Sequence, residues 1–165
     1  MPLVRRAENY RAACRRVNCW YAACSTANMM KATGSYKQIK WDEHSFEQVS
    51  PEMKMTKASA VFSFFGEIEG EADVEYVMYY KYYDPNEIHK ANAKYVGLMR
   101  LAGKLNGKIG SFVMEDSGKF EEGEASSELK IIPGSGTGEL EGITGSAKYQ
   151  GCEDNRVCEI NYELH

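Results

Sequence analysis

Asp116 is the residue whose type and position most clearly suggest chemistry. It follows Phe112 and Met114 at alternate positions, so in a β-strand all three side chains point to one face. A carboxylate buried there has a raised pKa unless it is paired, and it can serve as a general acid or base. We therefore predict Asp116 and Tyr76 as catalytic residues. The alternative is that Asp116 lies at a rim and makes a turn over residues 117–118, because turns favour Asp.

The same face carries tyrosine and methionine side chains that could bind a ligand. Tyrosine hydroxyls on an apolar wall are typical of small-molecule pockets. Core packing is the alternative, because Tyr is frequent in half-buried strands, and the chain has 11 tyrosines. The predicted pocket consists of Tyr76, Met78, Tyr80, Tyr95, Met99, Phe112 and Met114.

The elements that position these residues are predicted to be β-strands. From Met30 onward, apolar runs of strand length alternate with Gly, Asn and Asp clusters. Strands are expected over 31–41, 54–65, 71–82, 94–103, 108–116, 119–132, 138–149 and 156–164. Eight such strands in sequence predict an all-β domain over 30–165, a single antiparallel up-and-down barrel. A barrel of about eight strands can be filled by side chains or can hold one small ligand.

Asn106-Gly107 is the strongest hairpin signal, and a two-residue turn there fixes the register. It places Gly97 opposite Asp116. The connection near 83–86 is longer, and symmetric pairing across it places Met78 opposite Gly97 and Glu75 opposite Arg100. That charged pair is expected to be an outward cross-strand salt bridge, or alternatively an interior pair that binds a substrate carboxylate.

The first 29 residues differ from the rest of the chain. They are rich in Ala, Arg and Cys, with Glu8 as their one acidic residue, and their apolar residues recur at helical spacing. We predict a loose N-terminal extension, disordered or helical, and a cytoplasmic protein. The alternative is an organelle transit peptide, since such peptides are Arg-rich and acid-poor.

Several classes of function are disfavoured. The net charge is −4 and no basic stripe is interleaved with aromatics after Met30, which argues against nucleic-acid binding. No apolar run approaches the roughly 20 residues of a membrane-spanning helix. The three histidines cluster with neither Cys nor carboxylates, so we predict no metal, no cofactor and no Ser-His-Asp triad. The Gly-rich segment 133–138 lacks the Lys-Ser/Thr ending of a phosphate loop and is interpreted as a tight connection.

Three further residues have two interpretations each. Cys152 and Cys158 flank a short loop and could form a disulfide, but without a secretory signal we expect free thiols. Trp41, at the end of the first predicted strand, either covers one barrel mouth as an aromatic lid or packs against the barrel end.

Longer segments resemble one family. GEIEGEADVEYVMYY, YVGLMRLAGKLNGKIGSFVMEDSGKF and IIPGSGTGELEGITG follow the motif order of the domain-of-unknown-function 3224 family. The resemblance runs from about Met30 to the C-terminus. It implies a calycin-like barrel similar to plant allene oxide cyclase, and no established reaction. The family's Glu-Arg pair in the fourth strand and its His in the fifth correspond here to Met99-Arg100 and Asp116, so the chain departs from that pattern.

Three functions are therefore expected, in this order. The first is binding of a small hydrophobic molecule inside the barrel. The second is a cofactor-independent isomerase or cyclase, as fold-level analogy suggests. The third is an oligomeric scaffold, a homo-oligomer formed through an outer apolar patch. That patch would consist of Val77, Tyr79, Val96, Leu98 and Val113.

Overall fold

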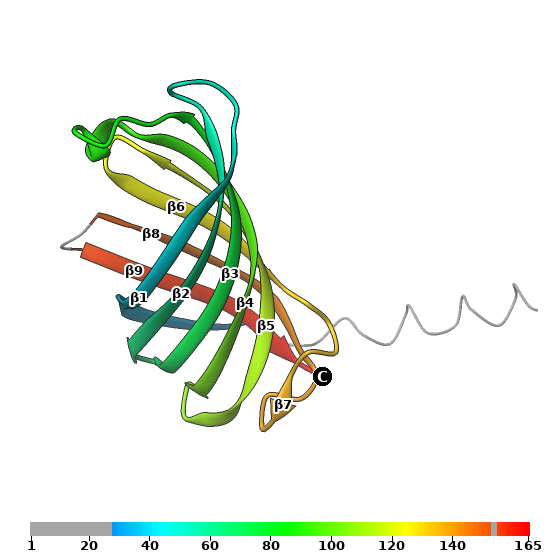
Figure 1. Ribbon diagram of the computed structural model, residues 1–165. Helices are drawn as coiled ribbons and strands as arrows, with labels where there is room; N and C mark the ends of the chain where they lie inside the picture. The colour runs from blue at the N-terminus through cyan, green and yellow to red at the C-terminus, as the bar shows by residue number, and fades with distance from the viewer. Residues whose placement is uncertain (1–27, 153–154) are drawn as a thin grey trace, which may run out of the picture.

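The computed structural model describes residues 28–152 and 155–165, and these are almost entirely β-structure (Figure 1). One 3-10 turn, η1 (Ile88–Lys90), interrupts the strands. The strands are β1 (Met30–Gln48), β2 (Lys54–Gly66), β3 (Ile68–Tyr82), β4 (Asn92–Leu105), β5 (Lys108–Glu121), β6 (Glu124–Ile131), β7 (Thr137–Gly138), β8 (Ile143–Cys152) and β9 (Asn155–Leu164). The all-β prediction is confirmed.

Eight of the nine strands form a closed ring. The sheet order is β4-β3-β2-β1-β9-β8-β6-β5-β7, and β4 also pairs with β5. Every paired neighbour is antiparallel. Most connections between ring strands are short, but residues 83–91 join β3 to β4, and the segment that contains β7 joins β6 to β8. The two-residue β7 lies outside the ring and pairs with the start of β5. The ring therefore has an interior face, which holds the buried side chains, and an exterior face.

The β4–β5 hairpin has the predicted register. Asn106 and Gly107 both have positive φ, which the tightest hairpin turn requires, and Gly97 pairs with Asp116. The next predicted turn, over residues 117–118, is wrong. β5 continues to Glu121, and the turn is made by Glu122 and Gly123, which also have positive φ.

The first and seventh predicted strands also differ from the observed ones. β1 does not end at Trp41 but continues to Gln48, because β2 pairs with it from Gly34 to Gln48 across two register shifts. The strand predicted over 138–149 is divided. Its first residue belongs to β7, and β8 begins only at Ile143, because the intervening turn folds inward and buries Leu140 completely.

The β3–β4 register is two residues away from the symmetric prediction. Tyr76, not Met78, lies opposite Gly97. An irregularity of β3 between Tyr80 and Tyr82 accounts for one of the two residues. The predicted Glu75–Arg100 pair is therefore absent. Arg100 lies opposite Asp73 and donates to Ser111 Oγ at 3.1 Å, while Glu75 accepts from Ser59 Oγ. A shift of two residues preserves the face to which each side chain points.

Side chains fill one half of the interior. Near the β4–β5 turn and the start of β8, the inward side chains are almost fully shielded from solvent. Asn106 Nδ2 donates a hydrogen bond to Tyr162 Oη at 2.8 Å at this end of the ring. Leu140 closes this end of the ring against Gly110 and Gly136. The packed half includes Ile68, Leu101, Leu105, Phe112, Ile131, Ile143, Ile160 and Tyr162.

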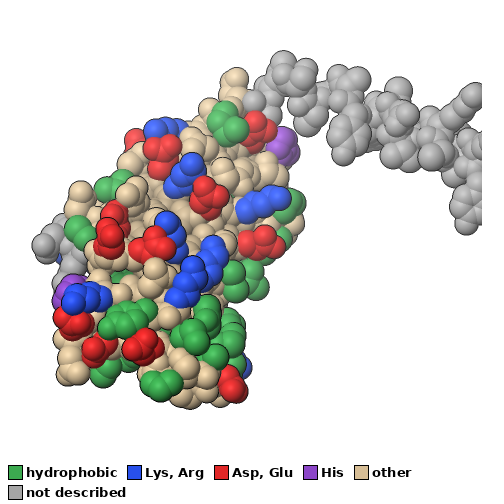
Figure 2. All heavy atoms as spheres, turned by 90° about the horizontal axis from the view of Figure 1, so that it is seen from above, with side chains coloured by type: hydrophobic (Ala, Val, Ile, Leu, Met, Phe, Trp, Pro, Cys, Tyr) green, Lys and Arg blue, Asp and Glu red, His purple; other side chains and the backbone are tan. Residues whose placement is uncertain are grey.

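The outer surface mixes charge and apolar groups. Figure 2 shows acidic and basic side chains interspersed over one face, with hydrophobic side chains gathered in one area. Val77, Val96 and Leu98 of the predicted outer patch are exposed, and self-assembly through them stays a prediction. Residues 1–27 of the predicted extension lie outside the described residues, so that prediction is untested. In the described part of the chain, no helix has the length and apolar character needed to cross a membrane.

Candidate ligand-binding site

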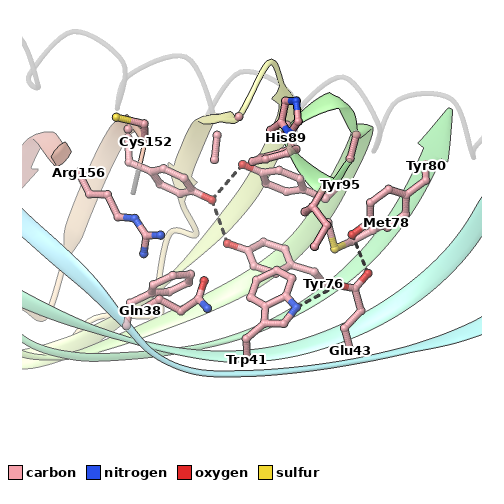
Figure 3. Close-up of a pocket in the computed structure, with 18 of the residues that line it drawn as sticks. Gln38, Trp41, Glu43, Tyr76, Met78, Tyr80, His89, Tyr95, Cys152 and Arg156 are labelled. Carbon is pink, nitrogen blue, oxygen red and sulfur yellow. Dashed lines mark hydrogen bonds between the residues drawn. The ribbon is translucent and has the colours of Figure 1, made fainter. Parts of the chain in front are cut away.

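The other half of the ring interior is hollow. A cavity of about 540 Å³ lies among all eight strands of the ring and the connection after β3 (Figure 3). This volume is in the range typical of small-molecule sites. Most of the wall is aromatic, and a few polar groups interrupt it. The lining includes Tyr36, Gln38, Trp41, Glu43, Phe62, Tyr76, Met78, Tyr80, Tyr83, His89, Tyr95, Phe120, Ala125, Tyr149 and Arg156.

One cross-strand row positions Tyr76. Tyr76, Gly97 and Asp116 are directly paired on β3, β4 and β5. Gly97 has no side chain, and a Cβ there would overlap the backbone of Glu75 and the ring of Tyr76. The ring of Tyr76 therefore crosses over Gly97, and its hydroxyl donates to Asp116 Oδ2 at 2.6 Å.

The neighbouring row repeats this arrangement one strand further on. Tyr95, Gly118 and Ser127 are paired on β4, β5 and β6, and Tyr149 on β8 pairs with Ser127. A Cβ at Gly118 would overlap both the ring of Tyr95 and Ser127 Oγ. Tyr95 passes over the glycine, and its hydroxyl lies 2.8 Å from Ser127 Oγ. Gly118, which the sequence suggested as a turn, is thus a site in mid-strand where a ring approaches the backbone.

The two rows bring three tyrosine hydroxyls together. Tyr149 Oη lies 3.0 Å from Tyr76 Oη and 3.2 Å from Tyr95 Oη, and it donates to Asp116 Oδ2 at 3.1 Å. Figure 3 shows the rings of Tyr76 and Tyr95 directed toward this point. We call Tyr76, Tyr95, Tyr149 and Asp116 the hydroxyl cluster. It forms a polar surface between the cavity and the packed half.

Asp116 is the carboxyl group of the hydroxyl cluster, whose four residues are all buried. Only 2% of it is exposed, and its Oδ1 has no hydrogen-bond partner in the described residues. Removal from water raises the pKa of its carboxyl group, and hydrogen bonds from Tyr76 and Tyr149 only partly offset that rise. Burial and the nearby carboxylate also raise the pKa of Tyr76 well above its ordinary value. The cluster therefore favours protonated, neutral groups.

A second polar group lies on the opposite wall. Glu43 Oε1 accepts hydrogen bonds from Thr56 Oγ1 at 2.6 Å and Tyr80 Oη at 2.8 Å, and its Oε2 accepts from Trp41 Nε1 at 2.9 Å. These bonds fix the indole of Trp41 over the ring of Tyr76, with centroids 6.1 Å apart. Trp41 thus lines the cavity while remaining 37% exposed.

β1 separates from β9 along one side of the cavity. The pairing of the two strands ends at Ser35 and Val157, and β1 then continues with β2 alone (Figure 1). Gln38 on β1 and Arg156 on β9 flank this separation. The guanidinium of Arg156 extends into the cavity above Gln38 (Figure 3).

The residues predicted for the pocket divide into two groups. Tyr76, Met78, Tyr80 and Tyr95 line the cavity. Met99, Phe112 and Met114 point inward but belong to the packed half. Asp116 is buried in a strand interior and not at a rim, and it lies behind the tyrosines without lining the cavity.

Sequence reasoning missed most of the polar lining. Glu43 was outside the predicted first strand, and Arg156 was the first residue of the last one. Tyr149 was the last residue of the predicted strand 138–149. It is two residues from Ala147, so both side chains point to the same, inner face. Tyr95 lies opposite Gly118 in the register that the Asn106-Gly107 turn fixes, and this pairing is the signal that could have found one of the two rows.

Sulfur and metal chemistry add little to this site. Cys152 is exposed and Cys158 buried, and both are free thiols because they pair with Asn155 and Tyr149 and not with each other. Within residues 28–152 and 155–165, no group of three His, Cys, Asp or Glu side chains is arranged to hold a metal ion. The predicted absence of a cofactor stays a prediction.

Comparison with known proteins gives a family and a fold. Residues 32–164 match the model of a family described as "Protein of unknown function (DUF3224)". The crystal structure of a protein with unknown function from the DUF3224 family of Shewanella oneidensis MR-1 is similar, with a TM-score of 0.68 and 23% sequence identity. The match covers 84% of this chain and 99% of that one, and at this identity it shows the fold alone. No curated protein matches.

Proposed function

The chain belongs to the DUF3224 family, and from the geometry of its site we propose that it binds one small, largely apolar molecule inside the ring. The observation that carries this proposal is the cavity of about 540 Å³, with aromatic walls and three converging tyrosine hydroxyls at one side. Apolar walls with a few placed polar groups are the usual composition of ligand sites. The ligand would bury a flat or unsaturated body against the rings and present an oxygen or nitrogen to the hydroxyl cluster.

The proposal extends to the type of fold. A closed ring of eight antiparallel strands with one packed and one hollow half is the arrangement expected of a calycin-type barrel that holds a ligand, similar to allene oxide cyclase. The packed half supplies stability, so the hollow half can remain open. An interior divided in this way supports binding more than a structural role.

Filling the cavity should abolish binding. Ala125 on β6 lines the cavity, and we expect Ala125→Trp to reduce the affinity for Nile red, a neutral apolar probe, by at least about tenfold, since the indole would occupy the space of the probe. The measurement is a fluorescence titration, in which the wild type should bind one probe per chain.

The matched control is Val96→Trp, which places the same side chain on the outer face, where Val96 is 51% exposed. Circular dichroism would establish that both variants are folded. Equal Nile red affinity in the wild type and the Ala125 variant would show that the probe binds elsewhere and would refute the proposal.

A second candidate function is a cofactor-free isomerase, and the hydroxyl cluster is the observation that favours it. Tyr76 reaches the cavity and contacts a buried carboxyl group whose pKa is raised, so the pair could exchange a proton with a bound ligand. In an isomerisation the proton leaves one ligand atom and returns to another, which requires no other reactant. In this proposal Tyr76 is the catalytic residue, and Asp116 positions it.

Isomerisation would appear as conversion without a change of mass. Small molecules extracted from the protein purified from its source would be incubated with ligand-free protein and followed by chromatography with mass detection. We expect a new peak of equal mass with the wild type and a loss of at least about 100-fold in rate for Tyr76→Phe combined with Asp116→Asn. Tyr79→Phe is the control, because that hydroxyl bonds to Met53 Sδ outside the cavity. Undiminished conversion by the double variant would exclude these roles.

A further inference from the structure

We infer that the ligand is an anion, a small apolar or aromatic carboxylic acid whose carboxylate binds to Arg156. This inference rests on the proposed binding function and names the ligand class of the same cavity. Arg156 is the one Lys or Arg that lines the cavity in the described part of the chain. Its guanidinium extends into the hollow space and not toward the outer surface (Figure 3).

The position of Arg156 is fixed by the fold. It precedes Val157, the first β9 residue that pairs with β1, so it lies where the two strands separate. Arg156 is itself half-buried, and among residues 28–152 and 155–165 it makes no salt bridge. Burial raises the pKa of the Tyr36 hydroxyl, and the positive charge of Arg156 opposes that rise. Both residues line the cavity. A partly desolvated guanidinium on a cavity wall favours a planar carboxylate, which can accept two parallel hydrogen bonds.

The other polar groups give the bound acid one orientation. Glu43 lies on the opposite wall with its oxygens occupied by Thr56, Tyr80 and Trp41, and its charge would repel a carboxylate there. Gln38 also lines the cavity, and its amide can donate a further hydrogen bond. The carboxylate would therefore lie beside Arg156, where β1 and β9 separate. The apolar body would lie against Tyr36, Phe62 and Trp41.

A matched pair of ligands tests the charge. 1-Naphthaleneacetate and its neutral amide have the same ring system and nearly the same size. By isothermal titration calorimetry, we expect the wild type to bind the acetate at least about tenfold more tightly than the amide, as charge-assisted hydrogen bonds to Arg imply. In Arg156→Met the affinity for the acetate should fall to that for the amide. The affinity for the amide should stay within about twofold of its wild-type value.

Arg100→Met is the control. Arg100 is exposed on the outer face, and its substitution removes the same charge from the chain. It should leave the preference for the acetate intact. If Nile red binds but acetate and amide bind equally, or if Arg156→Met leaves the preference unchanged, the inference is wrong while the proposed function stands. If Nile red and both naphthalene compounds all fail to bind, the proposed function itself is wrong.

Discussion

Replacing Phe112 by Ala is expected to lower the free energy of unfolding by about 3–5 kcal/mol, the usual effect of removing a fully buried phenyl ring. Phe112 is 0% exposed and lies opposite Leu101 in the packed half. The neighbouring side chains belong to strands joined by continuous pairing, so they cannot collapse into the space. Urea denaturation at neutral pH would measure the change.

The comparison variant is Phe120→Ala, which removes the same ring from the cavity wall. Phe120 is only partly buried and already borders empty space, so we expect less than half of the Phe112 effect. The contrast tests the division of the interior into packed and hollow halves. Equal losses for the two variants would contradict it.

Asp116→Asn is expected to stabilise the protein by about 1–3 kcal/mol at pH 7.5, because burying a charged group that is incompletely hydrogen-bonded costs about that much. Asn has the same shape and no charge. It can accept the hydrogen bond of Tyr76 and donate to Tyr149. A carboxylate kept where an amide would be more stable is typical of a functional site.

The gain should depend on pH. Because the pKa of Asp116 is raised in the folded state, the folded protein binds this proton more tightly than the unfolded chain. The stability from that proton is fully present below the pKa of the unfolded chain and is lost as the pH rises through the folded pKa. The advantage of the Asn variant should therefore be small near pH 4 and largest at neutral pH.

Denaturation curves at pH 4 and 7.5 would measure this dependence. Asp73→Asn, on the outer face opposite Arg100, is the control and should change stability by no more than about 0.5 kcal/mol. A destabilised Asp116→Asn protein at pH 7.5, or a difference that does not vary with pH, would contradict the interpretation of the buried carboxyl group.

The fold was predictable where local signals are strong. Alternating apolar residues identified the strands, and Asn106-Gly107 fixed one register, because a two-residue turn leaves no freedom in pairing. The β3–β4 register was not predictable, since residues 83–91 form a long connection preceded by an irregularity in β3. Gly118 was misinterpreted as part of a turn. A glycine that lets an aromatic ring pack against the backbone cannot be distinguished by sequence alone from a glycine in a turn.

The site was partly predictable, because the alternation of apolar residues along a strand shows which side chains point inward. Alternation placed Asp116 and Tyr76 on the inner face, but it gives no position along the axis of the ring. It therefore could not distinguish Tyr95, which lines the cavity, from Met99, which is packed. Arg156 reaches the cavity because β1 and β9 separate beside it, and that separation depends on pairing between the two ends of the chain.

The measurement that tests the central claim most directly is native mass spectrometry of the protein purified from its own source. The proposed function predicts a species heavier than the chain by one small organic molecule, which is lost on denaturation and is absent from the Ala125→Trp variant. The ligand class inferred from Arg156 further predicts that the released molecule ionises as an anion. Only the mass of the ligand-free chain in the wild type, before and after incubation with Nile red and 1-naphthaleneacetate, would contradict the claim that this ring encloses a binding site.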